Sequence, residues 1–468
     1  MELLNLKALV VGMGRSGLDT ARFLKQQGAV VTVSDMAPEN QVPDSARNIR
    51  EMGVQIELGG HNPETFTQAE LIVISPGVPH TIAVIQAARE KGIPVLGEIE
   101  LASRFVSEPI VAVTGTNGKT TTTRLLGDML DRSGLKVFVG GNIGTPLMSY
   151  LLMDEKVDWL VLEISSFQLD TIESFRPDVS LLLNISDDHL DRYDDVEAYA
   201  RSKGRLLENQ DSQDVAVLNG YDTWIRRVSQ NAPVTKTYFT GREDSEIGTD
   251  ITSGAIQFRG LDMLDMMLAH KAESTQAHTE TRAAISLQGI AMTCPHELEN
   301  IAAAGLATIV CGGNLSGIDK ALQEFKGLPH RLELVARIDG VSFYNDSKAT
   351  NVDAVLRALE CLPQPIHLIM CGRDKGGNFK LLTTAVRQKV KSLTLWGEAA
   401  PKIENALGNI APTQVVASME DAVAHAFGSA VPGESILLSP GCTSFDNYQN
   451  YKERGLAFST VVSRRNFG

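Results

Sequence analysis

The chain has 468 residues, of which 43% are hydrophobic and 21% are charged. At roughly 100 to 200 residues per domain, this length predicts two to four domains of an ordinary globular protein and excludes a single small core. Lys and Arg number 43 and Asp and Glu number 57, which gives a formal net charge of −14. This charge argues against nucleic acid or anionic lipid as a partner. An anionic ligand must therefore be held by local groups, such as glycine loops, helix N-termini, metal ions or single cations.

Cysteine usage and the N-terminal sequence indicate a reducing compartment. The five cysteines are odd in number, widely spaced and without a Cys-x-x-Cys pair, which argues against a disulfide framework and a zinc site. They are Cys294, Cys311, Cys361, Cys371 and Cys442. No secretion signal precedes the first apolar run, and no window reaches the roughly 18 apolar residues of a membrane helix. We expect a cytoplasmic protein.

Short runs of Val, Ile and Leu recur along the chain, each followed by a loop and a segment of helical period. They occupy residues 8–11, 30–33, 71–74, 110–113, 136–139, 159–162 and 179–183. Continuous apolar runs that alternate with helices predict parallel strands covered on both faces, and hence an α/β fold. Breaks near 94–98 and 327–330 predict three domains, at 1–97, 98–328 and 329–468. The pattern weakens between about 240 and 293, where we assign no elements.

A first glycine loop, Gly12 to Gly17, follows the first predicted strand, and Asp35 closes the next strand about 20 residues on. This pattern is typical of a Rossmann-like dinucleotide site, but a glycine turn that merely packs a helix on a sheet has the same residues. A loop of this form can also hold the diphosphate of a nucleotide-linked substrate. The pattern alone leaves these interpretations open.

A second glycine loop, residues 114–121, follows the strand predicted at 110–113 and has the sequence Thr-Gly-Thr-Asn-Gly-Lys-Thr-Thr. It is a shortened form of the P-loop, in which backbone N–H groups surround phosphate, Lys119 supplies a cation and Thr120 offers a hydroxyl to Mg²⁺. We therefore expect a central P-loop ATPase-like domain that binds ATP and Mg²⁺. Two nucleotide sites in one chain favour ATP plus a nucleotide-linked substrate over hydride transfer.

Polar groups follow several later strands. Glu163 ends one of them, at the sheet edge where ligands bind in open α/β sheets, and a carboxylate there suits Mg²⁺. A polar cluster at 184–193 contains His189. Taken singly, His189 is more often a hydrogen-bonded loop histidine and Lys203 a solvated helix lysine. The third domain adds polar loops around Arg331, Lys348, Lys375 and Ser444, which suit a carboxylate-bearing second substrate.

Together these segments resemble the Mur ligase family. The resemblance rests on residues 114–121, 141–144, 163–169, 188–193, 330–331, 345–351 and 439–446. It implies a three-domain α/β protein with Rossmann-like terminal domains around the P-loop domain. It also implies an ATP-dependent amide ligase with two Mg²⁺ ions, which adds D-glutamate to UDP-N-acetylmuramoyl-L-alanine through an acyl phosphate in cytoplasmic peptidoglycan precursor synthesis. We expect a monomer without nucleic acid or membrane insertion.

The resemblance also implies roles for individual residues. Those implied for the UDP-sugar are Ser16, Asp35, Gly77 and Asn142. Those implied for ATP are Gly115, Thr116, Asn117, Gly118, Lys119, Thr120, Thr121, Asn300, Arg331 and Asp346. Those implied for D-glutamate are Thr350, Lys375, Ser444 and Tyr451. The implied metal ligands are Thr120, Glu163, His189 and Lys203, with Lys203 converted to an N-carbamate. The implied catalytic residues are Lys119, His189, Lys203 and Lys348. The chain departs from the family pattern at Met36, Glu297 and Tyr451.

Three other functions remain open on the residues alone. Another amide ligase, such as a folylpolyglutamate synthetase, shares the central glycine loop but has no need of an N-terminal diphosphate site. A nicotinamide-dependent dehydrogenase would use Gly12 to Asp35 and be indifferent to Lys119. A non-catalytic protein would bind ATP without releasing phosphate.

Overall fold

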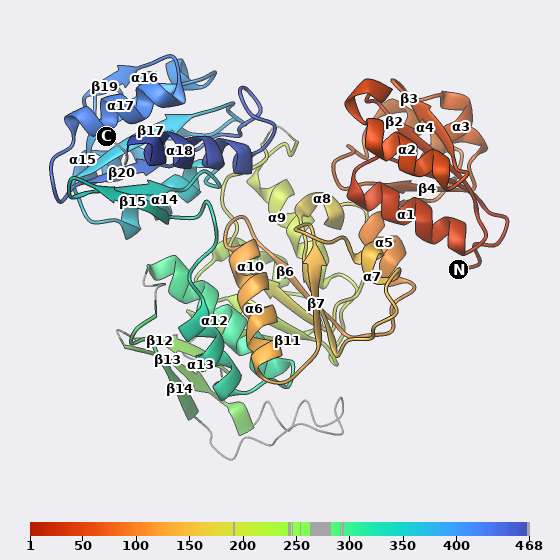
Figure 1. Cartoon of the computed structure of the whole chain (residues 1–468). Coiled ribbons are helices and arrows are strands. Elements are labelled where there is room, and N and C mark those ends of the chain that lie inside the picture. Colours follow the sequence, from red (N-terminus) through yellow and green to blue (C-terminus); the bar gives the residue numbers. More distant parts are fainter. Residues whose placement is uncertain are drawn as a thin grey trace.

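The computed structural model describes residues 1–190, 192–241, 247–252, 254–262, 282–290 and 294–465, together with Ser245 and Met292. Three successive parts of the chain each form an α/β unit around a sheet of their own (Figure 1). The N-terminal and C-terminal units both lie against the central unit, on different sides of it (Figure 1). Within the described ranges, no helix has the length and apolar character that crossing a bilayer requires.

The N-terminal sheet is fully parallel, in the order β3-β2-β1-β4-β5. Its strands are β1 (Lys7–Val11), β2 (Val30–Asp35), β3 (Gln55–Leu58), β4 (Leu71–Ile74) and β5 (Val95–Gly97). Its helices are α1 (Arg15–Gln26), η1 (Glu39–Gln41), α2 (Pro43–Glu51), α3 (Pro63–Gln68) and α4 (Ala83–Glu90). Along β1, Ala8 and Val10 pack with residues of α1 and α2, while Leu9 and Val11 pack with residues of α3 and α4. Both faces of the sheet are thus covered, which is why β1 is continuously apolar.

The central sheet has nine described strands in the order β14-β13-β12-β11-β10-β9-β6-β8-β7. They are β6 (Ile110–Thr114), β7 (Val137–Gly141), β8 (Trp159–Glu163), β9 (Val179–Leu182), β10 (Val215–Asn219), β11 (Thr235–Thr240), β12 (Gly248–Ile251), β13 (Ala255–Arg259) and β14 (Arg282–Ser286). Its helices are α5 (Glu98–Ser103), α6 (Lys119–Arg132), α7 (Leu147–Tyr150), α8 (Ser166–Leu169), α9 (Val196–Gly204), η2 (Arg205–Leu207), α10 (Thr223–Ser229), α12 (Pro295–Val310) and α13 (Leu315–Glu324). Because β6 lies between the parallel strands β8 and β9, the loops that follow these three strands meet at one sheet edge.

The C-terminal sheet has the order β15-β16-β20-β17-β18-β19, with only the β15–β16 pair antiparallel. Its strands are β15 (Glu333–Ile338), β16 (Val341–Asn345), β17 (Ile366–Cys371), β18 (Val390–Trp396), β19 (Thr413–Val415) and β20 (Ser435–Leu438). Its helices are α14 (Val352–Cys361), η3 (Phe379–Leu382), α15 (Thr383–Lys389), α16 (Ala400–Leu407), α17 (Met419–Ser429) and α18 (Tyr451–Arg465).

All seven strands expected from apolar runs are present, and the α/β prediction is confirmed. The apolar runs did not mark the other strands: β3 is only half-buried and β5 has three residues, and β10, β11 and the strands of the C-terminal sheet were given no ranges. The stretch left unassigned contributes β12, β13 and β14, and its remaining part lies largely outside the described residues.

The cysteine argument was wrong for one pair. Cys294 and Cys361 form a disulfide, with Cα atoms 5.2 Å apart, although 67 residues separate them in the sequence. Spacing along the chain gave no sign of this pair because its members come from different domains. Cys311, Cys371 and Cys442 are free and buried.

The two domain interfaces differ in chemistry. One hydrophobic cluster runs from the N-terminal sheet through α5 to the central sheet, and it includes an edge-to-face contact between Phe23 and Phe105. The C-terminal unit has two clusters of its own, and neither contains a residue of the central sheet. Its described contacts with the central unit include polar pairs such as Asn117 with Asp353 and Lys375 with Asp188.

Glu98, at the start of α5, provides a test of the first interface. Burial raises the pKa of its carboxyl from 4.5 to about 7, and its Oε1 accepts a hydrogen bond from Met148 N. The folded state therefore binds a proton more tightly than the unfolded chain, and stability falls as pH rises from about 4.5 to about 7. We expect Glu98→Gln to abolish this loss, which amounts to about 3 kcal/mol.

The measurement is the free energy of unfolding in urea at several pH values, for the wild type and the variant. Glu155→Gln, at an exposed position of the central domain, is the control and should follow the wild type. An equal slope in the wild type and Glu98→Gln would contradict this assignment.

Candidate functional site

The second glycine loop lies at the edge of the central sheet, between β6 and the fourteen-residue helix α6. Gly118, the residue before the helix, has φ +85°, and a Cβ there would lie 2.3 Å from Asn300 Oδ1. The loop is held from the neighbouring strand end, since Asn184 Oδ1 accepts from Asn117 N at 2.8 Å and Asn184 O accepts from Thr116 N at 2.8 Å. A glycine is therefore required at 118 both for the backbone turn and for the close approach of Asn300.

Two lysines meet at this loop, the buried Lys203 and the half-buried Lys119. Lys119 Nζ donates to the carbonyl oxygens of Gly115 at 2.7 Å and Thr116 at 2.9 Å, and Lys203 Nζ donates to the same Gly115 oxygen at 2.9 Å. Burial lowers the pKa of Lys119, and burial together with the charge of Lys119 lowers the pKa of Lys203 well below its usual range. Concentrated positive charge at a helix N-terminus suits a polyphosphate ligand.

A third lysine reaches the loop from the C-terminal domain. Lys348 Nζ donates to Thr120 Oγ1 at 2.7 Å. Burial, and secondarily the positive charge of Arg331, lowers the pKa of Lys348 to about 7. The two domains are therefore joined by a hydrogen bond directly at the first turn of α6.

Carboxylate groups face these cations. Glu163, at the end of β8, is buried; its Oε1 accepts from Asn142 Nδ2 at 2.8 Å, and its Oε2 accepts no hydrogen bond from any described residue. A buried carboxylate oxygen without a donor suits a bound cation. Elsewhere in the described ranges, and here, no three His, Cys, Asp or Glu side chains converge as metal ligands.

His189 and Asp188 lie next to this group, in the loop after β9. Burial lowers the pKa of His189 to about 4, so its ring is neutral at neutral pH and keeps a nitrogen lone pair. Burial opposes ionisation of Asp188, but Lys375, whose Nζ is 2.7 Å from Asp188 Oδ1, and His189 hold the pKa of Asp188 at about 2. The carboxylate is thus an anchor for the C-terminal domain, which also supplies Asn351 Nδ2 at 2.9 Å.

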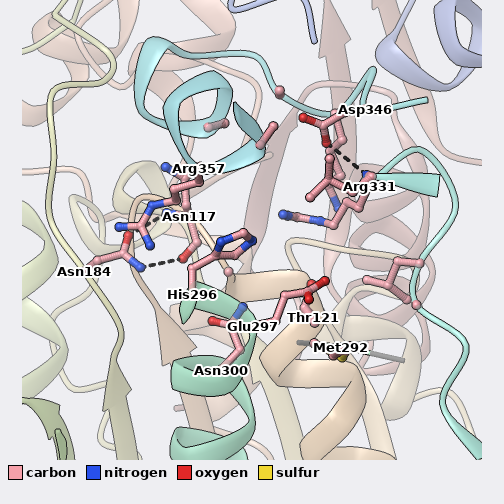
Figure 2. A pocket seen from close by; sticks show the side chains of 18 of the residues that line it. Asn117, Thr121, Asn184, Met292, His296, Glu297, Asn300, Arg331, Asp346 and Arg357 are labelled. Atoms are coloured by element: carbon pink, nitrogen blue, oxygen red, sulfur yellow. Dashed lines mark hydrogen bonds between the residues drawn. The ribbon is translucent and has the colours of Figure 1, made fainter. Parts of the chain in front are cut away.

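A pocket between the central and C-terminal domains lies beside the loop (Figure 2). Figure 2 shows Arg331 and Asp346 on one side of it, with His296, Glu297 and Asn300 of α12 opposite. Asp346 accepts from Ser439 Oγ at 2.9 Å and from Leu332 N at 3.2 Å, and burial raises its pKa to about 7. Asn300 Oδ1 accepts from Thr122 Oγ1 at 3.3 Å. The groups expected on the ATP side are therefore brought together here.

The residues expected for the amino acid substrate line a neighbouring pocket. Its wall includes Thr350, Lys375, Ser444 and Tyr451 from the C-terminal domain and His189 from the central domain. Arg192 lies over the Phe167 ring, 4.1 Å from its centroid, and both line the same pocket. Cationic and hydroxyl groups in one pocket suit a small carboxylate ligand.

The N-terminal domain has a separate pocket, lined by Gly12, Asp35, Met36, His61 and Gly77 among others. The Asp35 carboxylate accepts from Met13 N at 2.6 Å and Ala37 N at 2.8 Å, which fixes its position after β2. Ser16 Oγ is buried and has no hydrogen-bond partner in the described structure. Asn142, predicted for the same ligand, lies instead beside Glu163 in the central domain.

The sequence did not lead us to predict several residues that lie in these sites. Asn184 and Asp188 were inside the polar cluster at 184–193, so their position at a strand end was a usable signal. His61, His296 and Arg357 line pockets, yet nothing in their local sequence distinguishes them from surface residues.

The fold and this site define a class of protein in which a P-loop α/β domain is joined to two further α/β domains. Family comparisons match three successive segments: a Mur ligase MurD-like N-terminal domain at 6–97, a Mur ligase middle domain at 113–308 and a Mur ligase glutamate ligase domain at 330–442. The chain therefore belongs to the Mur ligase family.

Similar proteins agree with this family. The chain is 50% identical to the UDP-N-acetylmuramoylalanine--D-glutamate ligase of Desulfatibacillum aliphaticivorans over 99% of each chain. It is 47% identical to the ligase of the same name from Desulfosudis oleivorans, over 99% of this chain and 97% of that one. A MurF ligase from Thermotoga maritima, solved in complex with ADP, has a TM-score of 0.58 at 17% identity, with 99% of this chain and 100% of that chain covered.

Lys348 provides a pH test of the site. Because its pKa is lower in the folded state than in the unfolded chain, the unfolded chain binds more protons above pH 7, and stability rises with pH between about 7 and about 10. We expect the wild type to gain about 2 kcal/mol relative to Lys348→Met between pH 7 and pH 9. Urea unfolding at both pH values measures the gain, and Lys380→Met, at an exposed position of the same domain, should show none. If the difference in unfolding free energy between wild type and Lys348→Met were the same at both pH values, the pKa of Lys348 would not be lowered in the folded state.

Proposed function

We propose that this protein adds D-glutamate to UDP-N-acetylmuramoyl-L-alanine, with ATP as the source of free energy. The observation that carries the proposal is the meeting of Lys119, Lys203 and Lys348 at one glycine loop, opposite Glu163. The names of the two curated relatives, which match almost the whole chain, support the choice of substrates.

The substrates are divided among the three proposed domains. The UDP-sugar occupies the N-terminal domain (1–97), where Asp35 and Gly77 line one pocket and the buried Ser16 Oγ has no hydrogen-bond partner among the described residues, and it extends toward Asn142. ATP occupies the central domain (98–328) at residues 115–121 and Asn300. Arg331 and Asp346 of the C-terminal domain (329–468) complete the ATP site. D-Glutamate occupies the pocket of Thr350, Lys375, Ser444 and Tyr451.

Two Mg²⁺ ions fit the residues around the loop. Thr120 and Glu163 offer oxygen atoms, and Glu163 Oε2 is buried without a donor. The neutral ring of His189 is available as a nitrogen ligand. The strongly lowered pKa of Lys203 favours the free amine, which is the form that reacts with carbon dioxide to give a carbamate. Bound Mg²⁺ would neutralise charge on the phosphate oxygens.

The reaction then follows from the charges of the site. The L-alanyl carboxylate attacks the γ-phosphate of ATP, and ADP leaves, which gives an acyl phosphate. Lys119 and Lys348 stabilise negative charge on the transferred group. The D-glutamate amine attacks the acyl carbon and phosphate leaves, so that an amide forms. Positioning by two domains contributes to both steps.

The protein is proposed to act as a cytoplasmic monomer in peptidoglycan precursor synthesis. Its net charge of −14 argues against nucleic acid as a partner. No membrane insertion is part of the proposal.

Phosphate release tests the function. The purified chain is incubated with ATP, Mg²⁺, UDP-N-acetylmuramoyl-L-alanine and a panel of D- and L-amino acids. We expect release only with D-glutamate, and Lys119→Ala should lower the turnover by at least about 100-fold, because it removes a cation from the transferred phosphate. Full turnover in Lys119→Ala would refute that role. Phosphate release without a UDP-sugar would favour another amide ligase, and a response to NAD(P)H that ignores Lys119 would favour a dehydrogenase.

The loop glycines provide a matched pair of variants. Gly118→Ala forces a Cβ against Asn300, whereas Gly134→Ala adds a Cβ at φ +92° where no atom lies within 4 Å. We expect Gly118→Ala to weaken binding of a fluorescent ADP analogue by at least about tenfold. Gly134→Ala should bind normally and lose only about 1 kcal/mol of unfolding free energy. Equal affinities for the two variants would place the nucleotide elsewhere.

A further inference from the structure

The Cys294–Cys361 pair joins the two domains that close over the nucleotide pocket. Cys294 is the residue that caps the N-terminus of α12 in the central domain, and Cys361 is the last residue of α14 in the C-terminal domain. The two Cα atoms are 5.2 Å apart, within the range that a disulfide requires. Both side chains are half-buried, whereas the other three cysteines are buried.

Both helices line the pocket proposed for ATP. Helix α12 contributes His296, Glu297 and Asn300, and helix α14 contributes Arg357 and Ala358. The peptide that connects the domains also passes this pocket, at Phe325 to Leu328. A bond between Cys294 and Cys361 is therefore a second covalent connection across the same opening.

The other described contacts across this interface are non-covalent and can separate. They are hydrogen bonds and ion pairs, such as Asn117 Nδ2 to Asp353 Oδ2 at 2.7 Å and Lys375 Nζ to Asp188 Oδ1 at 2.7 Å. Among the described residues, no hydrophobic cluster is shared by the C-terminal and central sheets. Hydration of the separated groups offsets part of the loss when polar contacts of this type open, but water cannot replace a covalent bond.

We propose that Cys294 and Cys361 are a reversible modification site, whose oxidation locks the C-terminal domain closed over the nucleotide. Two thiols each lose a proton and an electron to form the disulfide. The oxidant is hydrogen peroxide, which is reduced to two waters, or a low-molecular-weight disulfide, which is reduced to two thiols. A dithiol reverses the reaction by exchange. Disulfides of reducing compartments are commonly of this transient kind.

The surroundings favour reaction at this pair. The N-terminus of the sixteen-residue helix α12 stabilises negative charge on the Cys294 sulfur. His296 Nδ1 lies 3.6 Å from Cys361 Sγ, a contact that holds the Cys361 sulfur beside Cys294. The proposal that the lock stops turnover rests on the proposed function, but the lock itself does not.

Three measurements on the full chain, oxidised with glutathione disulfide or reduced with dithiothreitol, test the lock. Peptide mapping after thiol blocking identifies the cross-linked pair. Dissociation of a fluorescent ADP analogue and X-ray scattering of the ligand-free protein report on domain opening without any turnover. Phosphate release with the proposed substrates then reports on the reaction.

We expect peptide mapping of the oxidised wild type to show the Cys294–Cys361 cross-link. ADP release and turnover should each be at least about tenfold slower than in the reduced protein. Dithiothreitol should restore both rates. Cys294→Ser, which keeps a good helix cap, and Cys361→Ser should be insensitive to oxidation. Cys311→Ala, at a buried cysteine outside the pair, should respond like the wild type.

Oxidation that yields no Cys294–Cys361 pair, or a cross-linked protein that releases ADP at the reduced rate, would overturn the proposal. If phosphate release fails in both redox states while ADP release still slows on oxidation, the proposed function is wrong and the lock stands.

Discussion

The concentration of positive charge at the central glycine loop is the constraint on which the rest of the structure depends. Lys119 and Lys203 donate to one carbonyl oxygen, that of Gly115, and a third lysine, Lys348, reaches the first turn of α6. Burial, and secondarily nearby positive charges such as Arg331, lower their pKa values, so the charged state has a high free energy until an anion binds. The site is therefore organised in advance for a polyanion, and Glu163 and Asp188 limit the repulsion without removing it.

The two domain interfaces have different consequences for this site. A continuous hydrophobic cluster fixes the N-terminal domain against the central domain, so the pocket around Asp35 has a defined position relative to the glycine loop. The C-terminal domain is attached mainly through polar contacts at Asp188, Asn117 and Thr120. These contacts are made by the site residues themselves, so closure of this domain and completion of the site are one event. A disulfide between Cys294 and Cys361, as proposed above, would hold the C-terminal domain in the closed position.

The residues that depart from the family pattern lie at the pocket walls. Glu297 accepts a hydrogen bond from Cys294 N at 3.0 Å and thereby caps α12, while it also lines the pocket proposed for ATP. Met36 is exposed and lines the N-terminal pocket together with His61, whose ring forms a 2.8 Å hydrogen bond with Ser34 Oγ. Tyr451 lies near Lys348, whose Nζ is 5.4 Å from the ring centroid. Each change leaves the cations of the glycine loop in place.

The amino-acid sequence by itself determined the α/β class, seven strands of the first two sheets and the glycine loop, because these depend on apolar runs and on residues adjacent in the chain. Strand ends and polar loops also indicated Glu163 and the cationic groups of the third domain, whereas the roles of most individual site residues relied on resemblance to a family. Tertiary structure alone decided that Lys203, from a helix far along the chain, shares a carbonyl with Lys119, that Asp188 anchors Lys375, and that Cys294 meets Cys361. These pairs join residues from separate elements, and their distances depend on strand order and domain closure, neither of which leaves a periodic pattern in the sequence.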